Sequence, residues 1–300
     1  MPIDLTPQII SSQFKVNTFT GNNQFFSDSQ GDRQVAALSS GGFVVTWQAQ
    51  NEDGSGWGIY AQRYTDTGAP AGSEFRVNST WANDQLFPSI TALAVGGFVI
   101  TWQSYLQEGG SNPRNGVYAQ RYSESGVPNG SDFRLNTTTN EEQSFSAVSA
   151  LSDGGFVAIW HSFLQDGNDY GIFGQRVDSN GNALSGEFPI NQQTAGNQVE
   201  PSLTTLADGG FVVTWETINQ DGNGYGIYGR RYLGNGNPAS DEFRVNTSFI
   251  GDQVNPSVTA LTGGGFVVTW QSTDDGSSLG IFGQRYDAAG AATGAEFRVI

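Results

Sequence analysis

The 300-residue sequence contains no cysteine and only one histidine, His161. The lack of cysteine excludes disulfide bridges and thiolate metal sites, and a single histidine cannot form an imidazole cluster around a metal. Charged residues make up only 14% of the chain, and 13 basic residues against 29 acidic ones give a net charge of −16. Because nucleic-acid binding requires clustered Lys and Arg, we expect no nucleic-acid partner for this acidic protein.

Long hydrophobic runs are also missing. No apolar stretch approaches the roughly 18 residues of a membrane span, so we expect none. The first residues, Met-Pro-Ile-Asp-Leu-Thr-Pro-Gln, lack the basic and apolar regions of a secretory signal peptide. Three possibilities stay open: an intracellular protein, export by a route without such a signal, or a trimmed N-terminus.

Repetition is what the sequence has in abundance. Gly-Gly-Phe-Val-Val-Thr-Trp and its variants end at five tryptophans spaced 55, 58, 55 and 55 residues apart: Trp47, Trp102, Trp160, Trp215 and Trp270. Gly-Ile-Tyr-Ala-Gln-Arg-Tyr and then Glu-Phe-Arg-Val-Asn, or close variants, follow each time. Self-similarity at a fixed period of this length indicates a solenoid, a propeller or an array.

One unit, residues 191–246, shows what is repeated. Residues 201–206, 211–215, 227–232 and 242–246 read as four short strands separated by glycine-rich turns, and nothing has helical periodicity. Four antiparallel strands per unit predict an all-β fold, a five-bladed β-propeller. We expect an N-terminal tail over 1–13 and one propeller over 14–300, with units 14–78, 79–136, 137–191, 192–246 and 247–300.

The second strand of each unit is apolar on both faces. Phe211, Val213 and Trp215 point one way, and Val212 and Thr214 point the other. A strand that is apolar on both sides is covered on both sides, as it would be between two neighbouring blades. We therefore expect the five marker tryptophans in equivalent buried positions.

The chain has six copies of the fourth-strand sequence for five units. Residues 14–17 form an additional copy before the first unit, and residues 297–300 form the last. We expect one copy to close the ring by pairing with the blade made from the other terminus. The spare copy lies alongside, or a longer repeat array was cut here.

These markers resemble the Gly-Gly-Phe-Val-Val-Thr-Trp-Gln-Ser tandem repeats of large secreted or surface bacterial proteins, which often accompany calcium-binding RTX segments. The resemblance covers residues 14 to 300. It implies an extracellular or cell-surface module with a possible calcium association and no enzyme activity. The RTX nonapeptide itself is missing.

The loop between the second and third strands contains acidic and glycine residues in four units. Calcium takes six to eight oxygen ligands, which such loops supply. The candidate calcium ligands are Asp53, Asp166, Asp169, Asp221 and Asp275. Asp-Gly and Asn-Gly are also ordinary turn formers, and no loop shows a full EF-hand ligand series, so both interpretations stay open.

An aromatic residue precedes the third strand in three units: Trp57, Tyr170 and Tyr225. Each could stack on a sugar ring while nearby Asp and Asn bind its hydroxyl groups, and each could equally form a hydrophobic lid between blades.

Two further sets of residues are expected to be structural. The third-strand arginines should lie between blades on carbonyls or carboxylates, and the Asn–Gln pairs, seven residues apart, should bond backbone groups between blades.

Two positions break the pattern after the marker tryptophan. His161 and Glu216 replace the Gln found at 48, 103 and 271. They could form an acid/base pair, or they could be drifted surface residues.

Because five near-equal units offer no privileged cleft, the sequence favours a non-catalytic, lectin-like binding or adhesion module with a carbohydrate or cell-surface ligand. The alternatives are a structural spacer, or an enzyme with its site at the mouth of the central channel.

Overall fold

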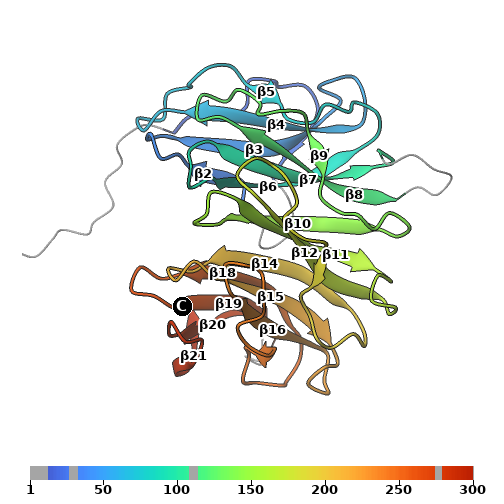
Figure 1. The fold of residues 1–300 in the computed structure, drawn as a ribbon, viewed down its shortest axis with the longest axis vertical. Coiled ribbons are helices and arrows are strands. Elements are labelled where there is room, and N and C mark those ends of the chain that lie inside the picture. The colour runs from blue at the N-terminus through green and yellow to red at the C-terminus, as the bar shows by residue number, and fades with distance from the viewer. Residues whose placement is uncertain (1–12, 27–32, 108–113, 274–278, 300) are drawn as a thin grey trace, which may run out of the picture.

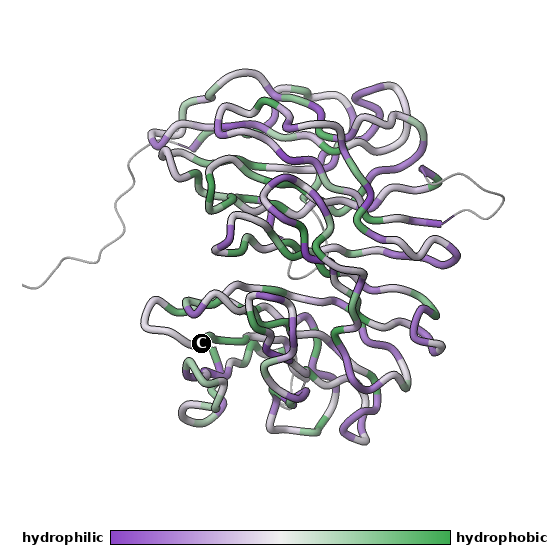
Figure 2. The backbone as a smooth tube through the Cα atoms, viewed as in Figure 1, coloured by the Kyte–Doolittle hydropathy of each residue, from purple (hydrophilic) through white to green (hydrophobic). Residues whose placement is uncertain are grey.

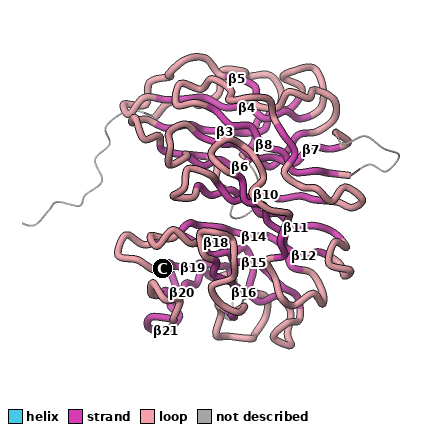
Figure 3. The backbone as a smooth tube through the Cα atoms, in the orientation of Figure 1, coloured by secondary structure: helices cyan, strands magenta, loops and turns pink. Residues whose placement is uncertain are grey.

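The computed structural model describes residues 13–26, 33–107, 114–273 and 279–299. These residues form 21 strands joined by loops, and no helix occurs among them (Figure 3). The strands make five antiparallel sheets in chain order (Figure 1). We number the sheets as blades 1 to 5.

Blade 1 contains β1 (Gln24–Phe25), β2 (Val35–Ala37), β3 (Phe43–Gln50), β4 (Trp57–Tyr64) and β5 (Phe75–Arg76). Blade 2 contains β6 (Gln85–Ala92), β7 (Phe98–Tyr105), β8 (Asn115–Tyr122) and β9 (Phe133–Arg134). Blade 3 contains β10 (Gln143–Ala150), β11 (Phe156–Phe163), β12 (Tyr170–Val177) and β13 (Phe188–Pro189). Blade 4 contains β14 (Gln198–Thr205), β15 (Phe211–Ile218), β16 (Tyr225–Tyr232) and β17 (Phe243–Arg244). Blade 5 contains β18 (Gln253–Ala260), β19 (Phe266–Ser272), β20 (Gly280–Tyr286) and β21 (Ala292–Val299).

The blades stand side by side with their first strands innermost. Strands β2, β6, β10, β14 and β18 follow one another around the centre, and the later strands of each blade lie outside them (Figure 1). The predicted five-bladed β-propeller of four-stranded blades is confirmed. In blade 1 the innermost strand is split into β1 and β2, which both pair with β3.

The Gly-Gly marker is explained by a close approach inside each blade. Gly97 ends the turn between β6 and β7, where the N–H of Leu93 donates to the Gly97 carbonyl at 3.0 Å. Its φ is +81°, and a Cβ built there would lie 2.1 Å from the carbonyl oxygen of Tyr122. Only glycine fits this left-handed and crowded position.

The core lies between the blades. The side chains of Trp102, Trp160, Trp215 and Trp270 are at most 1% exposed, and Trp47 is 3% exposed. The equivalent burial predicted for these residues is therefore confirmed. Hydropathy follows the same plan, because apolar residues gather in the strands and polar ones in the connecting loops (Figure 2).

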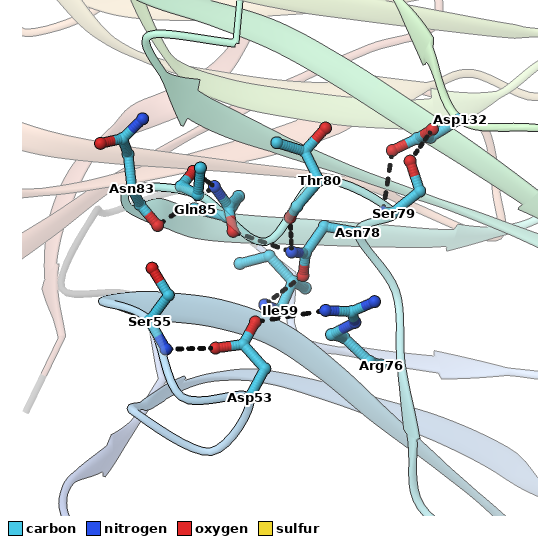
Figure 4. Close-up of polar contacts among 11 residues, drawn as sticks. Asp53, Ser55, Ile59, Arg76, Asn78, Ser79, Thr80, Asn83, Gln85 and Asp132 are labelled. Atoms are coloured by element: carbon cyan, nitrogen blue, oxygen red, sulfur yellow. Dashed lines mark hydrogen bonds and ion pairs between the residues drawn. The ribbon is translucent and has the colours of Figure 1, made fainter.

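The recurrent Asn and Gln bind the backbone where one blade leads into the next. Asn78 Oδ1 accepts the N–H of Ile59 at 2.8 Å, and its amide nitrogen donates to Gln85 Oε1 at 2.8 Å and to the Thr80 carbonyl at 2.6 Å (Figure 4). Gln85 Nε2 in turn donates to the Ala82 carbonyl at 3.0 Å. The predicted structural role of these amides is confirmed.

The third-strand arginines of blades 1 to 3 lie between blades, as expected, whereas Arg285 of blade 5 is exposed. Arg63 Nη1 donates to the carbonyl of Ser125 in the following blade at 2.8 Å. Arg176 donates to the Asn235 carbonyl of its following blade at 3.1 Å and to Asp153 Oδ2 at 2.8 Å.

The first and the last of the six fourth-strand copies occupy places that differ from the expectation. Phe14 and Val16 lie on blade 1, where the Phe14 and Tyr64 ring centroids are 5.2 Å apart. Strand β21 is the fourth strand of its own blade 5 and pairs with β20. Among the described residues, neither copy pairs with the blade from the other terminus, so the expected mode of ring closure is wrong.

No helix in the described part of the chain is long and apolar enough to cross a membrane.

Candidate active site at the channel mouth

A β-bulge in the innermost strand of blades 2 to 5 sets up the site. In β6 the register shifts between Leu86 and Ser89, and Phe87 takes a left-handed conformation with φ of +54°. The equivalent residues are Phe145, Glu200 and Asn255, with φ between +50° and +58°. A bulge redirects a side chain from the regular alternation of the strand. In each of these blades the bulge therefore leaves one residue whose direction cannot be read from the alternation of side chains along the strand.

In blades 1, 2 and 4 the residue after the marker tryptophan reaches the bulge of the following blade. Gln48 Oε1 accepts the N–H of Phe87 at 2.9 Å, and Gln103 Oε1 accepts the N–H of Phe145 at 3.3 Å. In blade 4 the acceptor is a carboxylate, because Glu216 takes this place. Its Oε1 accepts the N–H of Asn255 at 2.6 Å.

These two sets of residues meet in one hollow. A cavity of about 540 Å³ opens among blades 2 to 5, and its lining residues are Phe87, Phe145, Val199, Glu200, Glu216, Val254 and Asn255. It holds two carboxyl groups from neighbouring strands, since Val199 of β14 is paired with Glu216 of β15. The blades are therefore chemically unequal at this point.

Burial raises the pKa of Glu216 to about 7, and the negative charges of Glu200 and Asp252 act in the same direction. The hydrogen bond from the Asn255 backbone opposes this shift because it favours the carboxylate. Glu216 therefore exchanges its proton near neutral pH, which is the property required of a general acid.

His161 does not join this carboxyl pair. Its Nε2 lies 2.9 Å from Ser144 Oγ, and its ring centroid lies 4.8 Å from those of Phe145 and Tyr170. Full burial lowers the pKa of His161 to about 3, so the imidazole is neutral. The structure thus places it beneath the cavity wall, and the suggested acid/base pair of His161 and Glu216 is not formed.

Two aromatic side chains form one wall of the cavity. The rings of Phe87 and Phe145 stack with their centroids 4.6 Å apart. Both are half-buried, so each ring also presents area to the cavity. An apolar wall beside convergent polar groups is the usual composition of a small-ligand site.

The predicted calcium ligands Asp53, Asp166 and Asp221 lie on loops of three different blades, and Asp169 shares the loop of Asp166. Asp53, Asp166 and Asp221 each accept a backbone N–H two residues ahead, from Ser55, Asn168 and Asn223. This is the turn role that the sequence left open. Asp53 also contacts Arg76 at 3.4 Å, whereas Oδ2 of Asp166 and Oδ2 of Asp221 are buried without a hydrogen-bond donor in the described structure.

Asp169 is exposed with φ of +28°, and Asp275 lies outside the described residues. Within the described ranges, no three potential His, Cys, Asp or Glu ligands come together. Calcium binding stays a prediction for these loops.

The predicted sugar-stacking residues are also kept apart. Trp57, Tyr170 and Tyr225 are half-buried at the start of β4, β12 and β16, in three different blades. Trp57 packs on Phe25 with centroids 5.7 Å apart, and the Tyr170 hydroxyl donates to Glu142 at 3.4 Å. The residues at the bulges could not be found from the repeat, because a bulge changes which residues face the channel.

Comparisons with known proteins establish the fold. A protein of unknown function from Dyadobacter fermentans DSM 18053 has a TM-score of 0.61 at 11% identity, over 92% of this chain and 85% of that one. The GH93 alpha-L-arabinofuranosidase of Fusarium graminearum, solved with arabinobiose, has a TM-score of 0.53 at 14% identity, with the same coverage of 92% and 85%. A candidate exo-beta-1,3-galactanase from Bifidobacterium bifidum s17 has a TM-score of 0.50 at 12% identity, over 90% and 91%. No family model matches the sequence, and no curated protein matches it.

These neighbours contradict two expectations from the sequence. The two neighbours above with a named activity are an arabinofuranosidase and a candidate galactanase, not adhesion modules. The expected non-catalytic binding module, and with it the absence of catalysis, is therefore wrong. The physical reason is local: the five units differ in the residues that face the channel, and a repeated scaffold can hold a single site there.

Proposed function

We propose that this protein is a glycoside hydrolase whose active site is the cavity at the channel mouth. The observation that supports this most directly is the pair of carboxyl groups in that cavity, Glu216 and Glu200, one of which is buried enough to hold a proton near neutral pH. Glycoside hydrolysis commonly uses two such carboxyl groups, a proton donor and a carboxylate partner.

Glu216 is the proton donor in this proposal. As the bond between the anomeric carbon and the glycosidic oxygen breaks, its proton passes to that oxygen, which leaves as an alcohol. Glu200 is the carboxylate partner: it takes a proton from the attacking water, or it first attacks the anomeric carbon and is released by water. Both routes leave one water added across the bond.

Phe87 and Phe145 supply the apolar contact. Sugar rings present C–H groups on one face, and aromatic rings are large apolar surfaces that suit such contact. The stacked pair lines the same hollow as both carboxyl groups. The substrate class is therefore a polysaccharide or oligosaccharide bound at the channel mouth. Similar structures named as arabinofuranosidase and galactanase support this class.

The test is release of reducing sugar from arabinan, galactan and xylan by the purified chain and by the variant Glu216→Gln. Glutamine already occupies the equivalent position in three other blades, at 48, 103 and 271, so this substitution suits the fold. We expect activity on at least one polysaccharide, and a loss of about 10²- to 10⁴-fold in Glu216→Gln, whose melting temperature should not fall below that of the wild type.

The variant Gln103→Glu is the matched control, since it places a carboxyl at the equivalent position of blade 2 and leaves Glu216 in place. We expect it to remain active. Equal turnover by wild type and Glu216→Gln, or no turnover of any polysaccharide tested, would refute the assignment.

A further inference from the structure

Four interfaces between consecutive blades bury the same third-strand residue. Ile59, Val117, Ile172 and Ile227 are each 0% exposed. The equivalent residue of blade 5, Ile281, is 41% exposed. The fourth strands repeat this contrast, because Val245 of blade 4 is 2% exposed whereas Val299 of blade 5 is 44% exposed. One face of blade 5 is therefore an interblade surface without a blade on it.

Blade 1 has the complementary surface. Val35 pairs with Val45 in the same register in which Ile90 pairs with Ile100 in blade 2. Ile90 is 0% exposed beneath blade 1, whereas Val35 is 55% exposed. A blade 5 that lies against a blade 1 buries both Val35 and Ile281.

Among the described residues, no hydrophobic cluster joins blade 5 to blade 1 of the same chain. Hydrophobic clusters of described residues join blades 1 and 2, 2 and 3, 3 and 4, and 4 and 5. The fifth cluster contains Trp47 and Val16 and lies on the face of blade 1 that points away from blade 2. Figure 1 shows the innermost strands as an arc that is open between β2 and β18.

The segment containing Phe14 and Val16 occupies part of the blade 1 surface. The Tyr64 hydroxyl donates to the Val16 carbonyl at 2.6 Å, just as the Tyr232 hydroxyl donates to the carbonyl of Ile190, a residue of the preceding blade, at 2.8 Å. Phe14 packs on Tyr64 as Phe75 of blade 1 packs on Tyr122 of blade 2, with centroid distances of 5.2 and 5.3 Å. Phe14 and Val16 thus take the places that Phe297 and Val299 of a docked blade 5 would fill.

We propose that this protein associates head to tail with a second copy of itself, blade 5 of one copy packing on blade 1 of the next. Strand β21 of the first copy displaces the segment around Phe14 and Val16, which forms no strand and whose side chains have the same chemistry as Phe297 and Val299. The occupant is a second copy because the exposed face of blade 5 and the face of blade 1 beneath Phe14 and Val16 are the two halves of an interface that the chain already forms four times. A contact between two different faces is heterologous, so it can continue into longer assemblies.

Arg285 gives the new interface a polar contact. It is exposed in blade 5, whereas Arg63 at the equivalent position donates to the Ser125 carbonyl of the next blade at 2.8 Å. The turn position equivalent to Ser125 in blade 1 is Thr67. In the assembly Arg285 donates to the Thr67 carbonyl of the second copy.

The absence of cysteine from the chain permits a direct test. Val35→Cys and Ile281→Cys are made as two separate single variants, mixed, and oxidised. We expect a disulfide-linked heterodimer in the mixture, and a ladder of oligomers from the double variant on a non-reducing gel. A double variant that links only within one chain would show ring closure instead, and no link in any sample would equally overturn the proposal.

Sedimentation of the purified 300-residue chain gives an independent measurement. We expect the weight-average mass to rise with concentration from the low micromolar range upward, and Ile281→Asp to remove this rise. Leu233→Asp is the matched control, because Leu233 is 50% exposed on a turn of blade 4 and belongs to no open interblade face. A constant monomer mass for wild type, or equal loss of association in both variants, would contradict the proposal.

Discussion

The Glu216 side chain bridges blades 4 and 5 by accepting the backbone N–H of Asn255 at 2.6 Å. In blades 1 and 2 a neutral glutamine makes the same bridge. Exchange of the amide for a carboxyl keeps the contact and adds a group that can lose a proton. The interface between blades 4 and 5 is thus both a structural contact and the wall of the candidate active site.

Activity should depend on the ionisation of Glu216. Because burial raises its pKa to about 7, the protonated donor is the main form in weakly acidic solution and disappears as the pH rises through 7. We expect kcat to fall about tenfold per pH unit above this value. A pH–rate profile without this basic limb would remove Glu216 from the role of general acid.

The same shift predicts how stability changes with pH. The folded-state pKa of Glu216 lies above the unfolded value, so the folded protein binds the proton more tightly. Its contribution is therefore fully present at acidic pH and is lost as the pH rises through 7. We expect Glu216→Gln to match the wild type near pH 4 and to exceed it by about 3 kcal/mol in free energy of unfolding at pH 9. Urea unfolding of both proteins at the two pH values measures this difference.

A second carboxyl pair, in blade 1, should respond to pH in the same direction. Glu52 and Glu74 of blade 1 occupy the same repeat positions as Gln165 and Glu187 of blade 3. In blade 3 the Gln165 amide donates to Glu187 at 2.6 Å, whereas in blade 1 two carboxyl groups face each other. Burial, with the hydrogen bond and charge of Glu74, raises the pKa of Glu52 to about 8. Its contribution is present below the unfolded value and lost as the pH rises through 8, so Glu52→Gln should stabilise the protein at alkaline pH.

We expect Glu52→Gln to gain about 1 kcal/mol at pH 9 and nothing near pH 4, with the partial exposure of the pair reducing the effect. The matched control is Gln220→Glu, which creates the same carboxyl pair with Glu242 in blade 4. It should lose stability at alkaline pH. Parallel pH dependence of wild type and both variants in thermal melts would contradict this account.

Most of the fold could be predicted from the sequence, because markers such as Trp102, which is fully buried, and Gly97, whose position only glycine fits, recur at a fixed period. The site could be predicted only in part. Glu216 stands out as a break in a repeated glutamine. Glu200 does not stand out, because it lies in a bulge that interrupts the strand alternation, and the equivalent residues Phe87, Phe145 and Asn255 are not acidic. The open face of blade 5 has the same sequence pattern as the covered faces, so sequence alone could not reveal it.

The close approach at the Gly-Gly turn predicts a large stability effect. Gly97→Ala requires a left-handed backbone and a Cβ 2.1 Å from the Tyr122 carbonyl oxygen, so the turn must move. We expect a loss of about 3 kcal/mol or more in the free energy of unfolding. Gly130→Ala separates the two causes, since its φ is +80° with no atom within 4 Å, and should lose about 1 kcal/mol. Equal losses in the two variants would show that the carbonyl contact does not matter.

The last prediction concerns calcium. Asp166 Oδ2 and Asp221 Oδ2 are buried without a hydrogen-bond donor in the described structure, which leaves each carboxylate able to pair with a cation. An ion bound only by the folded state stabilises it, by about 2.7 kcal/mol per site at 100 times the dissociation constant. We expect millimolar calcium to raise the melting temperature above that in EGTA, and Asp166→Asn with Asp221→Asn to reduce this rise. Magnesium at equal ionic strength is the control. If magnesium gives the same shift, general screening of the net charge of −16 explains it and the loops act only as turns.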